Sequence, residues 1–347
     1  MIGDRCRDRP LERALSLPKG LSGPFVSISL LVALALLVAC GGGGDNGEPP
    51  ALTAAEICAA TPDEQPPIVS SSELVEASGV ASSRSQDGVF WAHNDSGDSA
   101  RFFAFDRTGF HHATYGLTGA EALDWEDMAI GPGPDEDDSY LYFADIGDND
   151  RARTEVYIYR VPEPAVARQT DTPTNNALTD FDKITLRYPD SAHDAETLLV
   201  DPADGALYII TKDITGRPSQ VFRASPDLED GSTATLEQVA EIDFFSFEST
   251  VQIPQGSSPL AEGLPLVPTG GEVSPDGGMV IVRTYGTAWV WERPADAPLA
   301  GAFAAPPCEA PTAVETQGEA IAFDPDGRGY FTVSEGAFPL LNHFTAQ

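Results

Sequence analysis

Groups of acidic residues recur along this 347-residue chain, and their side chains are the ones best suited to chemistry. DWEDMA places Asp124, Glu126 and Asp127 around a tryptophan, directly before an apolar run. Comparable groups stand in HNDSGD (93–98), DIGDN (145–149) and HDAE (193–196). Carboxylates this close together repel one another, so they need either basic partners or a hard cation with oxygen ligands, most naturally Ca²⁺.

The overall charge is strongly negative and limits the partners that the protein can have. The chain carries 54 acidic and 20 basic residues, which gives a formal net charge of −34. Nucleic acid is excluded as a partner, because recognition of a phosphate backbone needs a basic surface. Solubility in an extracellular setting is one explanation of such a charge, and cation binding by the acidic groups is the other.

Several other chemistries lack their motifs in this sequence. There is no GxSxG nucleophile elbow, no HExxH zinc motif and no GxxxxGK[ST] phosphate loop. Only His93 and His193 stand within the acidic groups, which is too few for a zinc site. These two histidines are therefore candidates for proton transfer rather than for metal binding.

The elements that must position these residues are short β-strands. Runs rich in Val, Ile, Tyr, Phe and Trp alternate with Gly, Pro and Asp turns, and helical periodicity is almost absent. One pattern recurs along the chain: small or acidic residues, a short apolar strand, a Pro/Asp/Gly turn and a second apolar strand. It is found in EASGVASSRSQDGVFWAHNDSGD, DWEDMAIGPGPDEDDSYLYFADIGDND, HDAETLLVDPADGALYIITKD, GGEVSPDGGMVIVRTYG and QGEAIAFDPDGRGYFTVSEG. A third strand usually follows, and fourth strands are fainter. We therefore predict an all-β protein, a β-propeller of five four-stranded blades, with six blades or an irregular β-sandwich as alternatives.

The way the ring closes can also be predicted. The last repeat lacks a clear fourth strand, and PPIVSSSELV (66–75) precedes the first repeat without a partner. We expect this N-terminal strand to complete the last blade. Cys58 and Cys308 would then lie near the same seam, and a disulfide between them is expected in an exported protein, with two separate buried thiols as the alternative.

The N-terminus indicates export. An apolar run from Phe25 to Ala39 has the length of a signal-peptide core, and LVAC (37–40) looks like a bacterial lipobox. We expect a signal peptide over 1–39, a lipid on Cys40, a flexible tether over 40–62 and the propeller over 63–347. The protein would be anchored in the bacterial cell envelope by lipid alone. An ordinary signal peptide or a short membrane anchor is the alternative.

The propeller fold predicts where the acidic groups meet. Strand 1 of each blade is innermost and strand 2 runs antiparallel to it, so strand 2 ends beside the start of strand 1. These positions should form one acidic rim around the channel, which also includes Glu272 and Glu319. The predicted metal ligands on this rim are Glu126, Asp127, Asp145, Asp148, Asn149, Asp194 and Glu196.

Basic groups on the same rim suggest a mechanism. Lys212 and Arg283 end two second strands at positions that we align, and they would bind an anionic group of a substrate. His93 or His193 would move protons to or from a metal-activated water. Alternatively the rim holds no metal, and Lys212, Arg283, backbone amides and water neutralise its carboxylates.

The motifs HNDSGD, DWEDMA, DIGDN, DAETLLVDP and GEAIAFDPDG resemble a widespread group of exported bacterial β-propellers. More distantly they are similar to the esterase-like phytase and SMP-30/gluconolactonase-like propellers. That resemblance implies a divalent ion on the open face of the channel and hydrolysis of a phosphoester, ester or lactone. The catalytic motifs of those families do not match residue by residue. The alternative is a non-catalytic module that binds a protein or glycan; in either case we expect a monomer.

Overall fold

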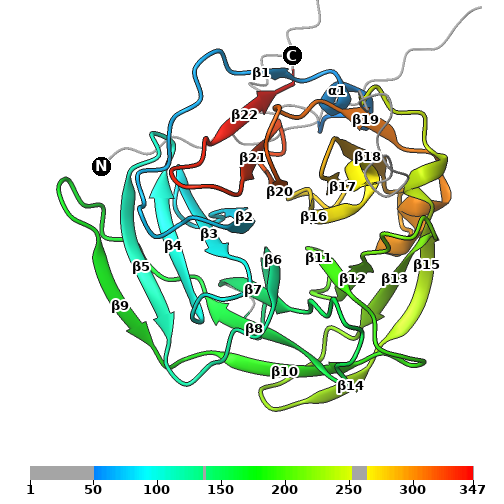
Figure 1. The fold of residues 1–347 in the computed structure, drawn as a ribbon, viewed down its shortest axis with the longest axis horizontal. Helices are drawn as coiled ribbons and strands as arrows, with labels where there is room; N and C mark the ends of the chain where they lie inside the picture. Colours follow the sequence, from blue (N-terminus) through cyan, green and yellow to red (C-terminus); the bar gives the residue numbers. More distant parts are fainter. Residues whose placement is uncertain (1–50, 136–137, 252–263, 347) are drawn as a thin grey trace, which may run out of the picture. The chain divides into compact units, whose positions relative to one another are not determined.

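Five β-sheets arranged around a central axis make up the fold, which is a five-bladed β-propeller (Figure 1). The computed structural model describes residues 51–135, 138–251 and 264–346. The signal peptide, Cys40 and the first part of the tether lie outside these residues. The prediction of five four-stranded blades is confirmed, and no sixth blade is formed by the described residues.

Each blade follows the chain from the centre of the ring outward. Blade 1 contains β2 (Ala77–Ser82), β3 (Val89–Asn94), β4 (Arg101–Asp106) and β5 (His111–Leu117). Blade 2 contains β6 (Trp125–Pro132), β7 (Ser139–Asp145), β8 (Val156–Pro162) and β10 (Asp182–Arg187). Blade 3 contains β11 (Ala195–Val200), β12 (Leu207–Thr211), β13 (Ser219–Ala224) and β15 (Glu237–Ile242). Blade 4 contains β16 (Pro268–Val273), β17 (Met279–Thr284), β18 (Ala288–Glu292) and β19 (Cys308–Ala310).

Blade 5 closes the ring with strands from both ends of the described chain. It contains β20 (Gly318–Phe323), β21 (Gly329–Ser334), β22 (Asn342–Thr345) and β1 (Thr61–Pro62), which pairs antiparallel with β22. Closure by an N-terminal strand is thus confirmed, but that strand lies upstream of the segment that we expected. Of that segment, Ile68 forms a single bridge to Leu340. Residues that we had assigned to the tether are therefore part of the propeller.

A short helix precedes the closing strand. Helix α1 (Ala54–Cys58) begins at a capping box in which Thr53 and Glu56 bond to each other's backbone amides, the arrangement that satisfies the first free N–H groups of a helix. It packs on β18 and β19 of blade 4. Among the described residues, no helix has the length and apolar character needed to cross a membrane.

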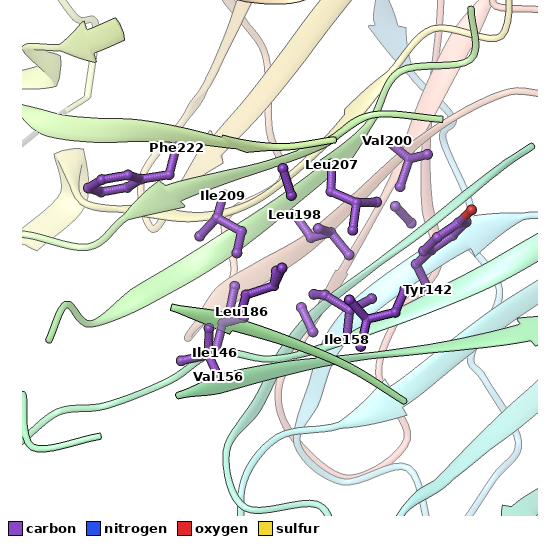
Figure 2. Packing of buried hydrophobic residues seen from close by; sticks show 14 of the residues in the cluster. Tyr142, Ile146, Val156, Ile158, Leu186, Leu198, Val200, Leu207, Ile209 and Phe222 are labelled. Carbon is purple, nitrogen blue, oxygen red and sulfur yellow. The ribbon is translucent and has the colours of Figure 1, made fainter. Parts of the chain in front are cut away.

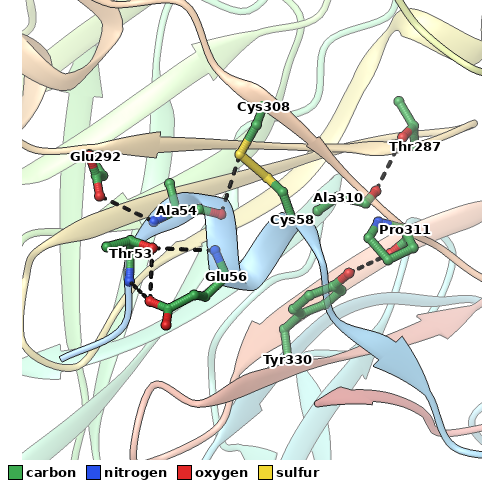
Figure 3. Close-up of a disulfide and its surroundings, with 10 residues drawn as sticks. All are labelled: Thr53, Ala54, Glu56, Cys58, Thr287, Glu292, Cys308, Ala310, Pro311 and Tyr330. Carbon is green, nitrogen blue, oxygen red and sulfur yellow. Dashed lines mark hydrogen bonds between the residues drawn. A yellow bond between two sulfur atoms is a disulfide. The ribbon is translucent and has the colours of Figure 1, made fainter. Parts of the chain in front are cut away.

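A disulfide fixes this helix to the ring (Figure 3). Cys58 at the end of α1 is bonded to Cys308 on β19, with 6.1 Å between the two Cα atoms. The pairing predicted from the sequence is confirmed. The bond crosslinks residues 250 positions apart and joins the segment before β1 of blade 5 to the outer strand of blade 4.

Two further strands were not predicted from the sequence. β9 (Thr174–Leu178) lies parallel to β5, and β14 (Thr233–Thr235) lies parallel to β10. Each belongs to the loop of the following blade and covers an outer sheet edge that would otherwise expose unpaired backbone groups. They strengthen the contacts between blades 1, 2 and 3.

Apolar side chains fill the space between successive blades. Figure 2 shows side chains from blade 2, including Tyr142 and Ile158, packed against side chains from blade 3, including Leu198 and Ile209. Every residue of the innermost strands β2, β11, β16 and β20 is buried. This packing holds the five inner strands rigidly around the channel, so residues at their ends have fixed positions.

Candidate metal centre at the channel mouth

A β-bulge stands at the start of every inner strand, at the same end of the channel. The pairing with the second strand shifts between Ala77 and Gly79, Trp125 and Asp127, Ala195 and Thr197, Pro268 and Gly270, and Gly318 and Ala320. The residues skipped by these shifts are Ser78, Glu126, Glu196, Thr269 and Glu319. A bulge redirects a side chain away from the regular alternation, so these five residues occupy equivalent places at the channel mouth.

A second set of equivalent positions follows the second strands. In each blade, one backbone amide beyond strand 2 donates to a carbonyl just before strand 1. The five donor residues are Asp95, Gly147, Lys212, Tyr285 and Glu335, with N–O distances between 2.8 and 3.3 Å. We call these five and the five bulge residues the collar. Its ten positions carry five carboxylates and one base.

Two groups of carboxylates within and beside the collar could hold a metal ion. Asp95, Asp124 and Glu126 form one group, and Asp95, Glu319 and Glu335 form the other. In each group the three ligand oxygens lie within 4.8 Å of one another. Asp95 belongs to both groups, so the two candidate positions are adjacent. Hard cations such as Ca²⁺ bind oxygen ligands of this kind.

The pKa values of these carboxyls are raised. Burial, followed by the charges of Asp95 and Asp194, raises the pKa of Asp124 to about 6. Burial and the charges of Asp95 and Asp124 raise the pKa of Glu126 well above its usual value. Burial and the neighbouring Glu335 raise the pKa of Glu319 to about 8. The cluster therefore takes up protons at neutral pH when no cation compensates its charge.

Gly147 provides the space in which the first group of carboxylates sits. A Cβ atom added at Gly147 would overlap Glu126 Oε1 and Asp124 Oδ2. The other four blades carry a side chain at the equivalent position, whereas here the backbone comes directly against two carboxylate oxygens. The all-oxygen donor set fits a hard cation, and a side chain at position 147 would displace these two carboxylates.

Lys212 compensates part of the charge. Its Nζ atom bonds to the carboxylate of Glu196 and lies 3.1 Å from the Tyr285 hydroxyl and 5.4 Å from the centre of the Tyr285 ring. Glu196, which we predicted as a metal ligand, is thus ion-paired with Lys212 and belongs to neither carboxylate group. Tyr285 was not recognised in the sequence as part of the rim.

Asp127, one of the predicted metal ligands, lies beneath the collar. Its carboxylate accepts hydrogen bonds from the amides of Met128 (2.8 Å), Leu198 (2.9 Å) and Gly271 (3.1 Å). Burial raises its pKa, and the three amide donors oppose that shift. Asp127 thus joins the inner strands of blades 2, 3 and 4, and it belongs to neither carboxylate group.

Asp145 is likewise bonded to protein donors. It is fully buried, and it accepts the amides of Leu123 and Asp124, both at 3.2 Å. The guanidinium of Arg153 lies 2.8 Å from the same carboxylate. These bonds hold the segment before β6 in place, so Asp145 positions Asp124 instead of belonging to its carboxylate group.

The other predicted ligands shape the neighbouring loops. Asp148 accepts the amides of Ala152 (3.0 Å) and Arg153 (2.7 Å), and its own amide donates to Asp194 at 2.9 Å. Asn149 is exposed beside it. None of Asp148, Asn149 and Asp194 belongs to the carboxylate groups found among the described residues.

His93 and Arg283 do not reach the rim, contrary to our expectation. They lie two residues before the collar positions Asp95 and Tyr285, and both are fully buried. His93 Nδ1 is 2.8 Å from the Asn94 carbonyl, and burial lowers the His93 pKa to about 4. Arg283 is ion-paired with Glu315. The residue equivalent to Lys212 in blade 4 is Tyr285, not Arg283.

Two other predicted rim residues are displaced. Glu272 lies three positions beyond the bulge of blade 4, where its carboxylate accepts from the Phe323 amide and, at 3.0 Å, from Arg84. His193 stands at the periphery of the collar, with Nε2 3.0 Å from Asp190 Oδ1. Neither side chain faces the carboxylate groups.

Comparison with known proteins gives no functional assignment. No known protein family matches the chain, and no curated protein is similar to it in sequence. Among solved structures, hydrazine synthase from Kuenenia stuttgartiensis aligns with a TM-score of 0.40 and 10% identity, over 78% of this chain and 96% of that one. A similarity at this level indicates no function for this chain, and the resemblance to phytase-like and gluconolactonase-like propellers is not confirmed.

Proposed function

We propose that the collar binds Ca²⁺ and that the protein is a calcium-dependent hydrolase of a small phosphoester, ester or lactone. The observation that carries the proposal is the pair of adjacent carboxylate groups that share Asp95. Their pKa values are raised mainly by burial and also by mutual repulsion, so a divalent cation would relieve an unfavourable charge.

Residues of the collar have chemistry that suits this reaction. When bound, Ca²⁺ would polarise a phosphoryl or carbonyl oxygen and acidify a bound water. Lys212 and the Tyr285 hydroxyl could orient an anionic oxygen of the substrate. Glu319 and Glu335 lie in one carboxylate group, and burial raises the pKa of both, so this pair could accept the proton of an attacking water. His93, being buried, has no part in this proposal.

A binding module is the second candidate, and one observation favours it. Exposed apolar side chains stand on loops that lead to or from collar positions: Val75, Leu123, Ile214, Val314 and Phe338. Such side chains could contact a protein partner around the acidic mouth. Phe338 is the one aromatic among the exposed large hydrophobic residues of the described chain, whereas glycan-binding surfaces commonly use several.

Hydrolysis assays distinguish the two candidates. The chain without residues 1–39 would be tested with p-nitrophenyl phosphate, p-nitrophenyl acetate and a γ-lactone, in Ca²⁺ and in chelator. We expect Ca²⁺-dependent turnover of at least one substrate, lost in Glu126→Gln and kept in Asp204→Asn, a hairpin residue at the other end of the channel. Calcium binding without turnover of any of the three would favour the binding module.

The location of the protein is a separate part of the proposal. We propose that it is an exported lipoprotein held in the cell envelope by lipid on Cys40, which is supported by the apolar run and the LVAC sequence. Cys40→Ser should leave the propeller folded and release it from the membrane fraction. Continued membrane association of this variant would show that another element anchors the protein.

A further inference from the structure

A small polar cavity adjoins the collar on the side of blade 3. Its volume is about 160 Å³, which corresponds to roughly five water molecules at their liquid volume. Arg151, His193, Lys212 and Arg217 are among the residues that line the cavity. These are four basic side chains in a protein of net charge −34, and the proposed reaction uses only Lys212 among them.

One buried carboxylate holds the two arginines next to each other. Asp213 Oδ2 lies 3.4 Å from Arg151 Nη2 and 2.8 Å from Arg217 Nη2. Burial alone would raise the pKa of Asp213, but hydrogen bonds from Thr215 and the two guanidiniums lower it. A single negative charge thus orients two positive ones, and each guanidinium has five N–H donors, of which this contact uses a minority.

Other polar residues also line the cavity. Gln220 is one of them, and its side-chain oxygen is buried without a hydrogen-bond partner. Arg151 has a φ angle of 51°, a left-handed conformation that is costly for a bulky residue. Asp194 is the other acid of the lining, and it accepts the amide of Asp148.

Lys212 links this cavity to the collar. Its side chain lines the cavity, while its Nζ atom bonds to Glu196 and Tyr285 in the collar. A ligand in the cavity would therefore lie on the far side of Lys212 from Glu196 and Tyr285, next to the collar. The volume of about 160 Å³ accommodates one small oxyanion such as phosphate.

We propose that this cavity binds the anionic group of the substrate, a phosphate or a comparably small oxyanion, next to the collar. Arg151 and Arg217 would bind it through charge-assisted hydrogen bonds, with Lys212 on the side of the collar. This inference rests on the proposed function for the reaction that follows, but oxyanion binding itself does not need the metal. The ligand could be free phosphate or the phosphate of an ester.

Calorimetric titration in the presence of chelator tests the cavity independently of Ca²⁺. The chain without residues 1–39 would be titrated with inorganic phosphate and with phenyl phosphate. We expect binding to wild type and to the control Arg187→Gln, an exposed arginine paired with Glu155. Arg217→Gln should weaken binding by about tenfold, and Arg151→Gln with Arg217→Gln should weaken it further, since each loses charge-assisted bonds.

The outcomes separate the cavity from the collar. Absence of phosphate binding by wild type, or equal binding by the double variant, would overturn the cavity proposal. Calcium binding without phosphate binding would support the metal site of the collar and overturn the cavity proposal. Phosphate binding without calcium binding would support the cavity proposal and overturn the metal site. If the double variant fails to fold, Arg217→Gln decides, because that side chain is 65% exposed. Tighter binding of phenyl phosphate than of inorganic phosphate would indicate that the ligand is a phosphate ester. Tighter binding of inorganic phosphate would indicate a free anion, and either result supports the cavity proposal.

Discussion

Glu126 and Asp127 are neighbours in sequence and have opposite environments. The Asp127 carboxylate accepts hydrogen bonds from three backbone amides on three inner strands. No described residue donates a hydrogen bond to the Glu126 carboxylate, which lies instead among other carboxylates at the channel mouth. Both are buried, so burial does not distinguish them. The presence or absence of protein donors separates an acid that holds the framework from an acid that can bind a ligand.

Removal of Asp127 should have the largest effect on stability. Asp127→Ala leaves three buried amides without an acceptor, and each unsatisfied group costs about 1–3 kcal/mol. We expect a loss of about 3–5 kcal/mol in the free energy of unfolding, measured by urea denaturation in chelator. Glu126→Ala should lose far less, because it removes repulsion. An equal loss for both variants would contradict the distinction drawn between these two acids.

Removal of the disulfide should lower the stability of the propeller without changing its response to Ca²⁺. Cys58→Ser with Cys308→Ser should lower the free energy of unfolding by about 2–5 kcal/mol, because the unfolded chain is no longer crosslinked over a long loop. The increase in melting temperature on addition of Ca²⁺ should remain that of wild type. Loss of the calcium effect would mean that the seam between blades 4 and 5 also organises the collar.

The pH dependence of stability should distinguish the collar from the framework. Burial and neighbouring charge raise the pKa of Glu319 to about 8, so the folded state keeps a proton that the unfolded state has lost. In chelator, the melting temperature should therefore fall as pH rises from 6.5 to about 8. Glu272, with a pKa of about 7, and His343, whose pKa is raised by Asp324 against the effect of burial, act in the same direction.

Adding Ca²⁺ should distinguish the pH dependence that comes from the collar from the pH dependence that comes from Glu272 and His343. Bound Ca²⁺ would hold the collar carboxylates ionised, so it should reduce the part of the pH slope that Glu319 supplies. The parts due to Glu272 and His343 should persist, since both lie away from the carboxylate groups. A pH slope that is the same in Ca²⁺ and in chelator would mean that the collar does not bind the ion.

A single methyl group should disturb the site with the smallest effect on the fold. Gly147→Ala would displace the carboxylates of Glu126 and Asp124, and it should weaken calcium binding measured by calorimetry. The cost to the free energy of unfolding should be about 1–3 kcal/mol, as for other overpacking changes. Gly116→Ala on β5, where the nearest atom is 4.0 Å from the added Cβ, is the matched control. Equal calcium affinities for both variants would exclude Gly147 from the site.

The architecture could be predicted from the sequence because it depends on local repeats. Strand, turn and strand patterns identified five blades, and the two cysteines identified the seam. The location of side chains at the channel mouth depends on the bulges, which shift the alternation by one residue. The ends of the second strands are equally hard to read from the sequence, so His93 and Arg283 were expected at the rim, although they lie two residues before the collar positions Asp95 and Tyr285.

The positions of the hairpin turns could have shown that Glu272 is not a rim residue. Glu196 and Glu319 each precede the first residue of their turns, Asp201 and Asp324, by five positions. The same count from Ser274 in SPDGG leads to Thr269, not to Glu272. Alignment on acidic residues gave the wrong position, because Glu272 is an acid of the framework. The bonds of Asp127 to strands of two other blades are not local, so no sequence pattern could reveal them.

The most direct test of the account is the effect of Ca²⁺ on the melting temperature of the metal-free protein. An ion that binds only the folded state stabilises it by about 2.7 kcal/mol at one hundred times its dissociation constant. We predict that Ca²⁺ raises the melting temperature of wild type and of Asp204→Asn. Asp95→Asn should abolish the rise, because Asp95 belongs to both carboxylate groups. A wild-type melting temperature that responds to neither Ca²⁺ nor chelator would contradict the account. Protonation and Lys212 would then compensate the negative charge of the collar without a metal ion.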